Sequence, residues 1–381
     1  MSEAALASTP ARAIPKRGLH IFYEERPRVL VLWPNPRAEQ IWECLKNRDA
    51  HEQADAFTYL RENGLGFSAV DPFPHPLNPL LGKGSTLSGL DLARALYVLA
   101  NCRQFDALVS MDTSSCLFFV IAKRLFGLRK PVIVVDPAMD LNSRIRRWIH
   151  SYVLRRVDAV VVFGTAQMRF LDSAFGGKVK ASFVRHRMDS AFFDATRTEA
   201  APEEKPYILS VGEDSGRDFE TLLQASEGAN FELVIRTGRS FNRPVPPNVT
   251  IQRERTSFET LRDLYAKAAL VVLPLRSTLH ASGINTLLEG MSMAKAVIVS
   301  GSEGIVDYVE HGRNACVVAP GDPVALRAAI DSLLGNPAET TKLGQNARQY
   351  CEAFCSMRIY MRRVSAIVHS ALKASQPVQR H

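Results

Sequence analysis

The feature that most constrains the fold is an alternation of short apolar runs with helical stretches, which the chain carries twice. Between residues 29 and 163 the runs are VLVLW, FSAV, ALVSM, PVIVV and AVVVF. Between residues 207 and 320 they are YILSVG, FELVIR, VTIQ, LVVLPL, AVIVS and ACVVAP. Continuous apolar strands separated by helices are typical of parallel sheets covered on both faces. The sequence therefore predicts an α/β protein of two Rossmann-like domains whose strand ends face each other across a cleft.

A polar segment divides the two series. DATRTEAAPEEKP, residues 194–206, predicts a linker between an N-terminal domain at 19–193 and a C-terminal domain at 207–355. Residues 1–18 are small and polar and lack the apolar region of a signal peptide, so we expect a flexible tail there.

Composition and charge limit the function classes. The longest apolar runs fall short of the ~20 residues that cross a bilayer, so no transmembrane span is expected. Six cysteines without a CxxC pair favour free thiols in a reducing compartment, hence a cytoplasmic location, and predict no metal site. The net charge of +8 favours anionic partners such as nucleotide phosphates or acidic lipid. Nucleic acid is not expected, because no basic stripe is interleaved with aromatic residues.

The stretch LPLRSTLHASGINTLLEGMSMA, residues 273–294, predicts a nucleotide site. A strand runs into a loop with Ser282 and Gly283, and a helix begins near Ile284 or Asn285. The free amides and the positive dipole end of such a helix suit a phosphate, and Glu289, deeper in the helix, suits ribose hydroxyls. The alternative is an ordinary strand–loop–helix unit with a glycine for the turn.

A second turn, GEDSGRDF, follows the strand that ends at Gly212. Arg217 at the start of its helix is suited to pair with a diphosphate through its planar fork. If the two turns lie on the same edge of the sheet, they would form a phosphate clamp. The alternative is that Arg217 lies in solvent. The absence of GxxxxGK[ST] excludes a P-loop NTPase, and the absence of GxGxxG weakens a dinucleotide dehydrogenase.

Polar residues also follow strands of the first series, where open sheets place ligands. They are Asn35, Asp112, Asp136 and Asp140. Each is also suited to cap a helix or turn, and Asp112 before Thr-Ser-Ser has the pattern of a cap. Asp112 and Asp136 are the acidic candidates for catalysis.

These motifs resemble a family. SVGEDSGRDFETLLQA and the 273–294 stretch, within about 207–348, are similar to the C-terminal half of the GT-B retaining glycosyltransferases of family 4 (glycosyl transferases group 1). The resemblance implies a hexosyltransferase that moves a sugar from a UDP- or GDP-linked donor to a glycan, lipid-linked or small acceptor bound by the N-terminal domain. It implies retention of configuration without a metal or cofactor, and a C-terminal helix, 356–381, that returns to the N-terminal domain.

The resemblance also implies residue roles. Gly212 and Arg217 bind the diphosphate, and Arg217 assists its departure in catalysis; Glu289 holds the ribose. Backbone amides of the loop contact phosphate and sugar, and the turn after the third strand contacts the base; these residues are Ser282, Gly283, Ile284, Asn285 and Thr286, and Arg253 and Arg255. In two departures, Ala281 takes the place of the first motif glutamate, and Glu213 that of a basic residue. Arg236 or Arg239 is a candidate to compensate for Glu213, and His280 for Ala281.

The segment 142–156 predicts a basic amphipathic helix, with Arg144, Arg146, Arg147, Arg155 and Arg156. Its apolar residues at helical spacing suit a core-facing stripe with a solvated basic back. The other interpretation is a face for anionic lipid or a polyanionic acceptor, which would place the protein at the inner face of the cytoplasmic membrane. Two further functions stay open: a GT-B-fold nucleotide-sugar epimerase, and a catalytically silent nucleotide-sugar-binding protein.

Overall fold

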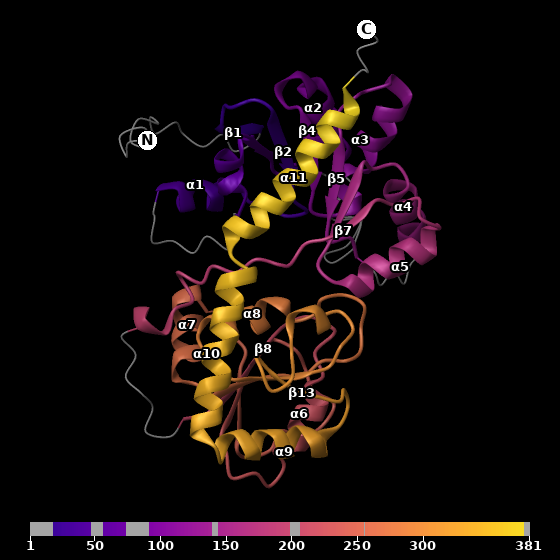
Figure 1. Cartoon of the computed structure of the whole chain (residues 1–381). Coiled ribbons are helices and arrows are strands. Elements are labelled where there is room, and N and C mark those ends of the chain that lie inside the picture. Colours follow the sequence, from indigo (N-terminus) through magenta and orange to yellow (C-terminus); the bar gives the residue numbers. More distant parts are fainter. Residues whose placement is uncertain are drawn as a thin grey trace.

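The computed structural model describes residues 18–46, 56–73, 91–138, 144–198, 206–254 and 256–376. Within these residues the chain forms two lobes, each built on a sheet, stacked one above the other (Figure 1). Alternate residues of one strand enter different cores: Val29 and Val31 join one apolar cluster, and Leu30 and Leu32 join another. Both faces of the sheet are thus buried, as the continuous apolar runs predicted. The predicted α/β fold of two Rossmann-like units is confirmed.

The first lobe contains a sheet with strand order β1-β3-β2-β4-β5-β6-β7 in the described residues. Its strands are β1 (Leu19–Tyr23), β2 (Arg28–Leu32), β3 (Gly66–Val70), β4 (Ala107–Ser110), β5 (Val132–Val135), β6 (Ala159–Val162) and β7 (Ala181–Phe183). Its helices are α1 (Ala38–Lys46), η3 (Ala56–Asn63), α2 (Leu92–Ala100), η4 (Cys102–Gln104), α3 (Thr113–Phe126), α4 (Arg144–Leu154) and α5 (Thr165–Phe175). The short helix η5 (Ala195–Arg197) follows in the segment between the lobes, beside α7 of the second lobe. All strand pairs are parallel except β1 with β3.

The second lobe contains a sheet with order β10-β9-β8-β11-β12-β13, with every pair parallel. Its strands are β8 (Ile208–Val211), β9 (Leu233–Arg236), β10 (Val249–Gln252), β11 (Leu270–Leu273), β12 (Val297–Ser300) and β13 (Cys316–Val318). Its helices are α6 (Phe219–Ser226), α7 (Phe258–Lys267), α8 (Ile284–Ser292), η6 (Val306–Tyr308), α9 (Pro323–Leu334) and α10 (Pro337–Phe354). The strand order reverses between β8 and β11, and open α/β sheets bind ligands at such a switch point.

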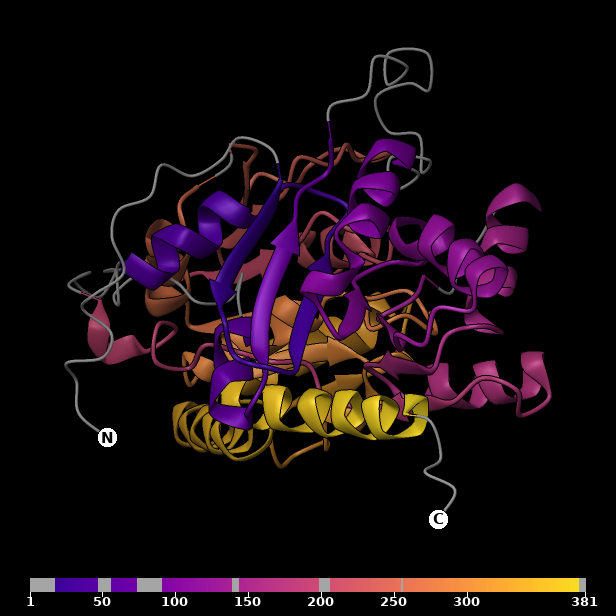
Figure 2. The same ribbon diagram turned by 90° about the horizontal axis from the view of Figure 1, so that it is seen from above.

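The last helix, α11 (Met357–Ser375), connects the lobes. From the end of α10 it crosses to the first lobe and runs along one face of that sheet (Figure 2). His369 Nε2 donates to the carbonyl of Asn63 at 3.0 Å, and Arg358 pairs with Glu62 at 3.1 Å. The return of the C-terminal helix to the N-terminal domain is therefore confirmed.

The carboxyl edges of the two sheets meet at the lobe junction. Tyr308 of η6 donates to the carbonyl of Phe163 at 2.7 Å, at the end of β6. Asp307 accepts from Thr165 N at 2.7 Å and from its hydroxyl at 2.8 Å. Because the N-cap residue of α5 is Gly164, which has no side chain to offer, a carboxylate of the second lobe caps a helix of the first.

Some predicted elements differ from the structure. Strand β1 was not predicted. In α4, Ile149 and Val153 are buried, whereas Ile145 and Trp148 are 63% and 60% exposed. The predicted core-facing stripe is therefore wrong for its first turn. None of the helices in the described ranges is long and apolar enough to span a membrane.

Candidate donor-binding site

The switch point of the second sheet brings together the two turns that the sequence predicted to form a clamp. One follows β8 and the other follows β11. Arg217 and Leu275 form an antiparallel bridge, and Arg276 N donates to the carbonyl of Gly216 at 2.9 Å. These backbone contacts fix the turns side by side at the carboxyl edge of the sheet.

Arg217 lies beneath both turns and is only 4% exposed. Its Nη2 donates to Thr286 Oγ1 at 2.9 Å, and its Nε lies 3.2 Å from an Asp214 carboxylate oxygen. Its Nη1 has no hydrogen-bond partner among the described residues. The guanidinium packs against Gly212 and Gly283, where a Cβ atom would overlap it. Burial lowers the pKa of Arg217, while Asp214 opposes this. A buried cation with an unmade hydrogen bond carries a desolvation cost, and binding of an anion to the free N–H relieves it.

Helix α8 begins directly above this guanidinium. Its N-cap is Gly283, with a φ of +75° and no capping side chain. Ile284 N donates to the carbonyl of Ala281 at 3.2 Å, so this amide is already used. The backbone amides of Asn285 and Thr286 donate no hydrogen bond in the part of the chain that the structure describes. The side chains of Ser282 and Ile284 are buried, at 6% and 8% exposure. The helix terminus can therefore serve a phosphate through its amides.

Glu289 lies one turn deeper in α8 and is 5% exposed. Its Oε2 accepts a hydrogen bond of 2.7 Å from the hydroxyl of Tyr265, which lies on α7. Burial, with Glu289 as the second cause, raises the pKa of Tyr265 well above its usual value. The charge of Glu289 also opposes the lowering of the pKa of Arg217. Arg217 and Glu289 thus belong to one buried polar network, and the Nε and Nη1 atoms of Arg217 make no hydrogen bond within the described residues.

Glu213, which takes the place of a basic residue of the family, bonds to the loop at the end of β9. The Glu213 carboxylate accepts from Gly238 N at 2.9 and 3.0 Å, and Arg239 Nη1 lies 3.5 Å from the Glu213 carbonyl oxygen. Arg239 is therefore the candidate compensating cation beside the clamp. Arg236 instead donates to Thr256 Oγ1 at 3.0 Å.

The predicted base-contacting turn is only partly described. Arg253 is exposed and donates to the carbonyl of Arg239 at 3.0 Å. Arg255 lies outside the described residues. Arg253 and Arg236 thus remain candidates at the outer end of the site.

In the first lobe, Asp112 is a helix cap. Its Oδ2 accepts from Ser114 N at 3.0 Å and from Ser115 N at 3.1 Å, at the start of α3. The same geometry follows from the Asp-Thr-Ser-Ser pattern, and among the described residues no hydrogen bond or ion pair joins Asp112 to the donor turns. Asp140 lies outside the described residues.

Asp136 reaches the other lobe. Its Oδ1 lies 3.8 Å from Nδ1 of His280. Gln167, which is fully buried on α5, donates to the same oxygen at 3.3 Å. Asp136 has a φ of +48°, a backbone conformation rare for residues with a side chain. Burial raises the pKa of Asp136, and the charge of His280 opposes that shift.

Two residues of the site were missed by sequence reasoning. His186, in the segment between the lobes, lies 2.8 Å from Asn285 Oδ1 through its Nε2, and its N donates to the Tyr308 hydroxyl at 2.8 Å. Burial lowers the pKa of His186 to about 3, so the ring is neutral and its Nε2–H orients the Asn285 amide. Tyr265 was the other omission. Neither carries a local signal, because each meets its partner far away in the sequence.

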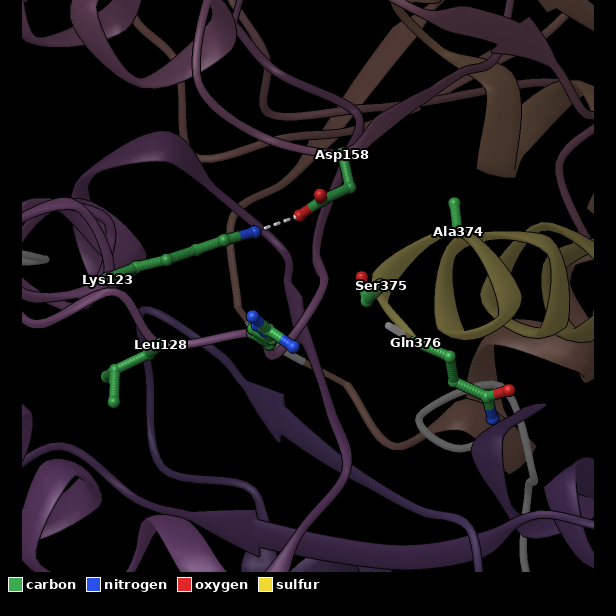
Figure 3. A pocket seen from close by; sticks show the side chains of 7 residues that line it. Lys123, Leu128, Asp158, Ala374, Ser375 and Gln376 are labelled. Carbon is green, nitrogen blue, oxygen red and sulfur yellow. Dashed lines mark hydrogen bonds and ion pairs between the residues drawn. The ribbon is translucent and has the colours of Figure 1, made fainter. Parts of the chain in front are cut away.

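A cavity of about 510 Å³ lies away from these turns, between the C-terminal end of α3 and that of α11 (Figure 3). Its charged groups include Lys123 and Asp158, which pair with each other at 2.5 Å. It lies near the end of the first sheet where the strands begin, and so it is separate from the donor turns.

Comparison with known proteins identifies the class. Residues 217–336 match the family model of glycosyl transferases group 1. The fold is similar to that of sucrose-phosphate synthase from Thermosynechococcus elongatus, with a TM-score of 0.74 and 15% identity over 92% of this chain and 100% of that one. It is also similar to Anabaena HepE in complex with UDP and glucose (0.63, 13%, 90% and 99%). A third similar structure is the UDP-forming α,α-trehalose-phosphate synthase from Burkholderia vietnamiensis (0.66, 10%, 90% and 97%). Among curated proteins, none matches the sequence.

The fold and the matched domain define the class of the protein, which is a glycosyltransferase with the GT-B fold. More particularly, its second lobe carries a glycosyl transferases group 1 domain, which contains Arg217, the α8 loop and Glu289.

Proposed function

We propose that the protein transfers a hexose from a UDP- or GDP-linked donor to a glycan, lipid-linked or small acceptor, with retention of configuration and without a metal or cofactor. The observation that carries this proposal is the buried guanidinium of Arg217, with its unpaired Nη1 below the open amides of α8. A cation and a helix terminus that converge on one point suit the diphosphate of a nucleotide sugar. That HepE was solved with UDP-glucose supports the choice of donor.

In the proposed reaction, the bond between the anomeric carbon and the diphosphate oxygen breaks, and its electron pair leaves with the nucleoside diphosphate. Arg217 and the α8 amides stabilise the charge that grows on that oxygen. The acceptor hydroxyl attacks the face that the leaving group vacates. Its proton passes to the departing phosphate, so that the atoms and charges balance without a separate base.

The first test is a ligand screen with the full chain. UDP, GDP and their common sugar conjugates are added separately, and the thermal unfolding midpoint is recorded. A ligand at about 100 times its Kd adds about 2.7 kcal/mol of stability, so one base series is expected to raise Tm by several degrees. A screen without any shift would contradict the proposal.

Donor turnover then separates the proposed transferase from its alternatives. Transfer to an added acceptor, or slow release of free sugar in its absence, is expected with the donor that the screen selects. Release of the sugar as its epimer would instead indicate an epimerase, and binding without turnover would indicate a silent binding protein.

We further propose that the first lobe meets anionic lipid through α4, at the inner face of the cytoplasmic membrane. Ile145 and Trp148 are exposed, and Arg144 and Arg147 lie exposed beside them. An exposed tryptophan among arginines suits the interface of an anionic bilayer. Arg155 and Arg156 instead lie over the rings of Phe175 and Tyr152, so the first two turns of α4 form this surface.

Removing the three arginines of α4 is expected to abolish most of the association with vesicles. The full chain is mixed with vesicles of phosphatidylcholine, alone or with phosphatidylglycerol, and pelleted. Binding to the anionic vesicles is expected to fall as salt shortens the Debye length and to fall further in Arg144→Gln/Arg146→Gln/Arg147→Gln. The control removes three charges elsewhere: Arg313→Gln/Lys342→Gln/Arg362→Gln. Equal binding by both triple variants, or none by the parent, would contradict the lipid proposal.

A further inference from the structure

We propose that the first lobe inserts an apolar face, formed by α2, α3 and α4, into an anionic bilayer, and that a row of cations at one end of this face binds the lipid headgroups. This inference rests on the lipid contact proposed for α4. It adds the two neighbouring helices and the amino edge of the first sheet. It also adds insertion of apolar side chains to the attraction between charges.

The exposed apolar side chains of the first lobe lie on one side of its sheet. Among the described residues of this lobe, the most exposed large apolar side chains are Leu92 and Leu96 of α2, Leu125 and Phe126 of α3, Ile145 and Trp148 of α4, and Phe170 of α5. These four helices bury their inner sides in one apolar cluster, whereas α1, η3 and α11 pack on the other face of the sheet. A single exposed apolar residue needs no explanation, but a group of them on one face marks an interaction surface.

Helix α3 makes the apolar face continuous. It lies between α2 and α4 and packs against both. Phe118, Ile121 and Leu125 recur at helical spacing along its outer side, where Phe118 and Ile121 are half-buried and Leu125 is 72% exposed. Gly127 ends the helix with a φ of +63°, and the chain turns away there, which leaves Phe126 73% exposed. Apolar side chains therefore extend across three adjoining helices.

The positive charge of the chain collects at one end of this face. Segments 123–130, 155–158 and 178–180 hold eight Lys and Arg residues against one carboxylate, Asp158, an excess of seven, and the whole chain has a net charge of +8. The segments lead into β5, β6 and β7, which are parallel neighbours, so they lie side by side at the amino edge of the sheet. Asp158 is already paired with Lys123. Exposed cations without an ion pair in the described structure are Arg124, Arg129, Lys178 and Lys180.

An anionic bilayer fits both parts of this surface. Leucine, phenylalanine and tryptophan side chains enter the boundary between headgroups and acyl chains, and cations beside them meet the headgroups. A second copy of the chain fits poorly, because its cations would meet those of the first copy, and like charges repel across an interface. A free phosphate compound would meet the cations but would leave the apolar side chains in water.

Insertion is tested at the end of α3 with the full chain. Vesicles of phosphatidylcholine with phosphatidylglycerol are pelleted at low and at high salt with the parent protein and two variants. Leu125→Gln/Phe126→Gln is expected to bind about tenfold more weakly at both salt concentrations, because the transfer of apolar groups is not screened by salt. Arg124→Gln/Lys178→Gln/Lys180→Gln is expected to bind more weakly at low salt only, because salt screens exposed charges.

The control is Val324→Gln/Leu334→Gln, which removes two exposed apolar side chains from α9 of the second lobe. It is expected to match the parent at both salt concentrations. Equal loss of vesicle binding in this control and in Leu125→Gln/Phe126→Gln would show that apolar surface acts anywhere on the molecule, and it would overturn the assignment to the α2–α3–α4 face.

A fluorescent reporter shows directly whether the end of α3 enters the bilayer. Phe126→Trp, made in a Trp148→Phe background, keeps a large apolar side chain at this position. Lipids brominated on their acyl chains are expected to quench the introduced tryptophan, by comparison with Trp148→Phe alone. Vesicle binding without added quenching would overturn the insertion of α3.

The remaining outcomes separate this inference from the earlier proposals. If Leu125→Gln/Phe126→Gln binds vesicles as the parent does, the inference is wrong and the α4 contact stands; a parent that binds no anionic vesicles overturns both. A dimeric parent and a monomeric Leu125→Gln/Phe126→Gln in sedimentation would show that a second copy covers the face instead. All variants are expected to bind nucleoside diphosphate normally, because the amino edge lies opposite the lobe junction. A parent that binds vesicles but no nucleotide would overturn the proposed glycosyl transfer alone.

Discussion

Arg217→Met is expected to weaken binding of UDP or GDP about 100-fold, which is about 2.7 kcal/mol, while the free protein stays as stable as the parent. The guanidinium is buried, and its Nη1 lacks a partner in the described structure. Removing a buried cation that is only partly paired is often neutral or stabilising when an apolar side chain of similar volume replaces it. The same removal takes away the charge that the diphosphate would meet. Calorimetry measures the affinity, and urea unfolding measures the stability.

Two variants make this prediction specific. Arg217→Lys keeps the charge but loses the planar fork, so its affinity is expected to lie between those of the parent and Arg217→Met. Arg243→Met removes an arginine that pairs with Glu227 away from the turns, and it is expected to leave the affinity unchanged. An Arg217→Met protein that binds the nucleotide normally but unfolds at much lower urea would show that Arg217 is structural.

Much of the fold follows from local pattern, because a buried parallel strand must be apolar on both faces. The runs that predicted β2, β4, β5 and β6 are fully buried in the structure. Strand β1 escaped prediction because it is an antiparallel edge strand, LHIFY, whose residues are mostly half-buried. Helical spacing also could not show that Trp148 is exposed, because the spacing defines a stripe without saying how far the neighbouring elements extend to cover it.

The candidate site also contains residues that a local sequence pattern predicts and residues that it does not. The α8 loop and Arg217 could be predicted because a glycine, a polar or cationic residue and a helix start lie within a few residues of each other in each turn. Tyr265 was indistinguishable from an apolar core residue of α7, because its hydroxyl meets Glu289 only after the chain has passed through β11. His186 meets Asn285 across 99 positions of sequence. The pairing of Asp136 with His280 depends on how the two lobes are placed, which no local pattern encodes.

Glu289→Gln is expected to weaken binding of the ribonucleotide about 10- to 100-fold, with inorganic pyrophosphate bound as before. A carboxylate that accepts from ribose hydroxyls contributes about 1.5–3 kcal/mol, as charged hydrogen bonds do. Glutamine retains an oxygen that can accept from Tyr265, so the α7–α8 contact is preserved. Pyrophosphate has no ribose, and it therefore reports on the Arg217 clamp alone. Competition calorimetry with both ligands measures the two effects separately.

Tyr265→Phe decides whether Glu289 acts on the ligand or only on the fold. This variant removes the hydroxyl that donates to Glu289 at 2.7 Å and leaves the carboxylate in place. If Glu289 binds ribose, Glu289→Gln loses the parent's preference for the ribonucleotide over its 2′- and 3′-deoxy forms, and Tyr265→Phe keeps it. If both variants lower the unfolding free energy and neither changes that preference, the carboxylate is a buried partner of Tyr265 and the ribose assignment is wrong. The comparison works because burial alone, at 5% exposure, fits either role, whereas discrimination between a hydroxyl and a hydrogen on the sugar requires direct contact with the ligand.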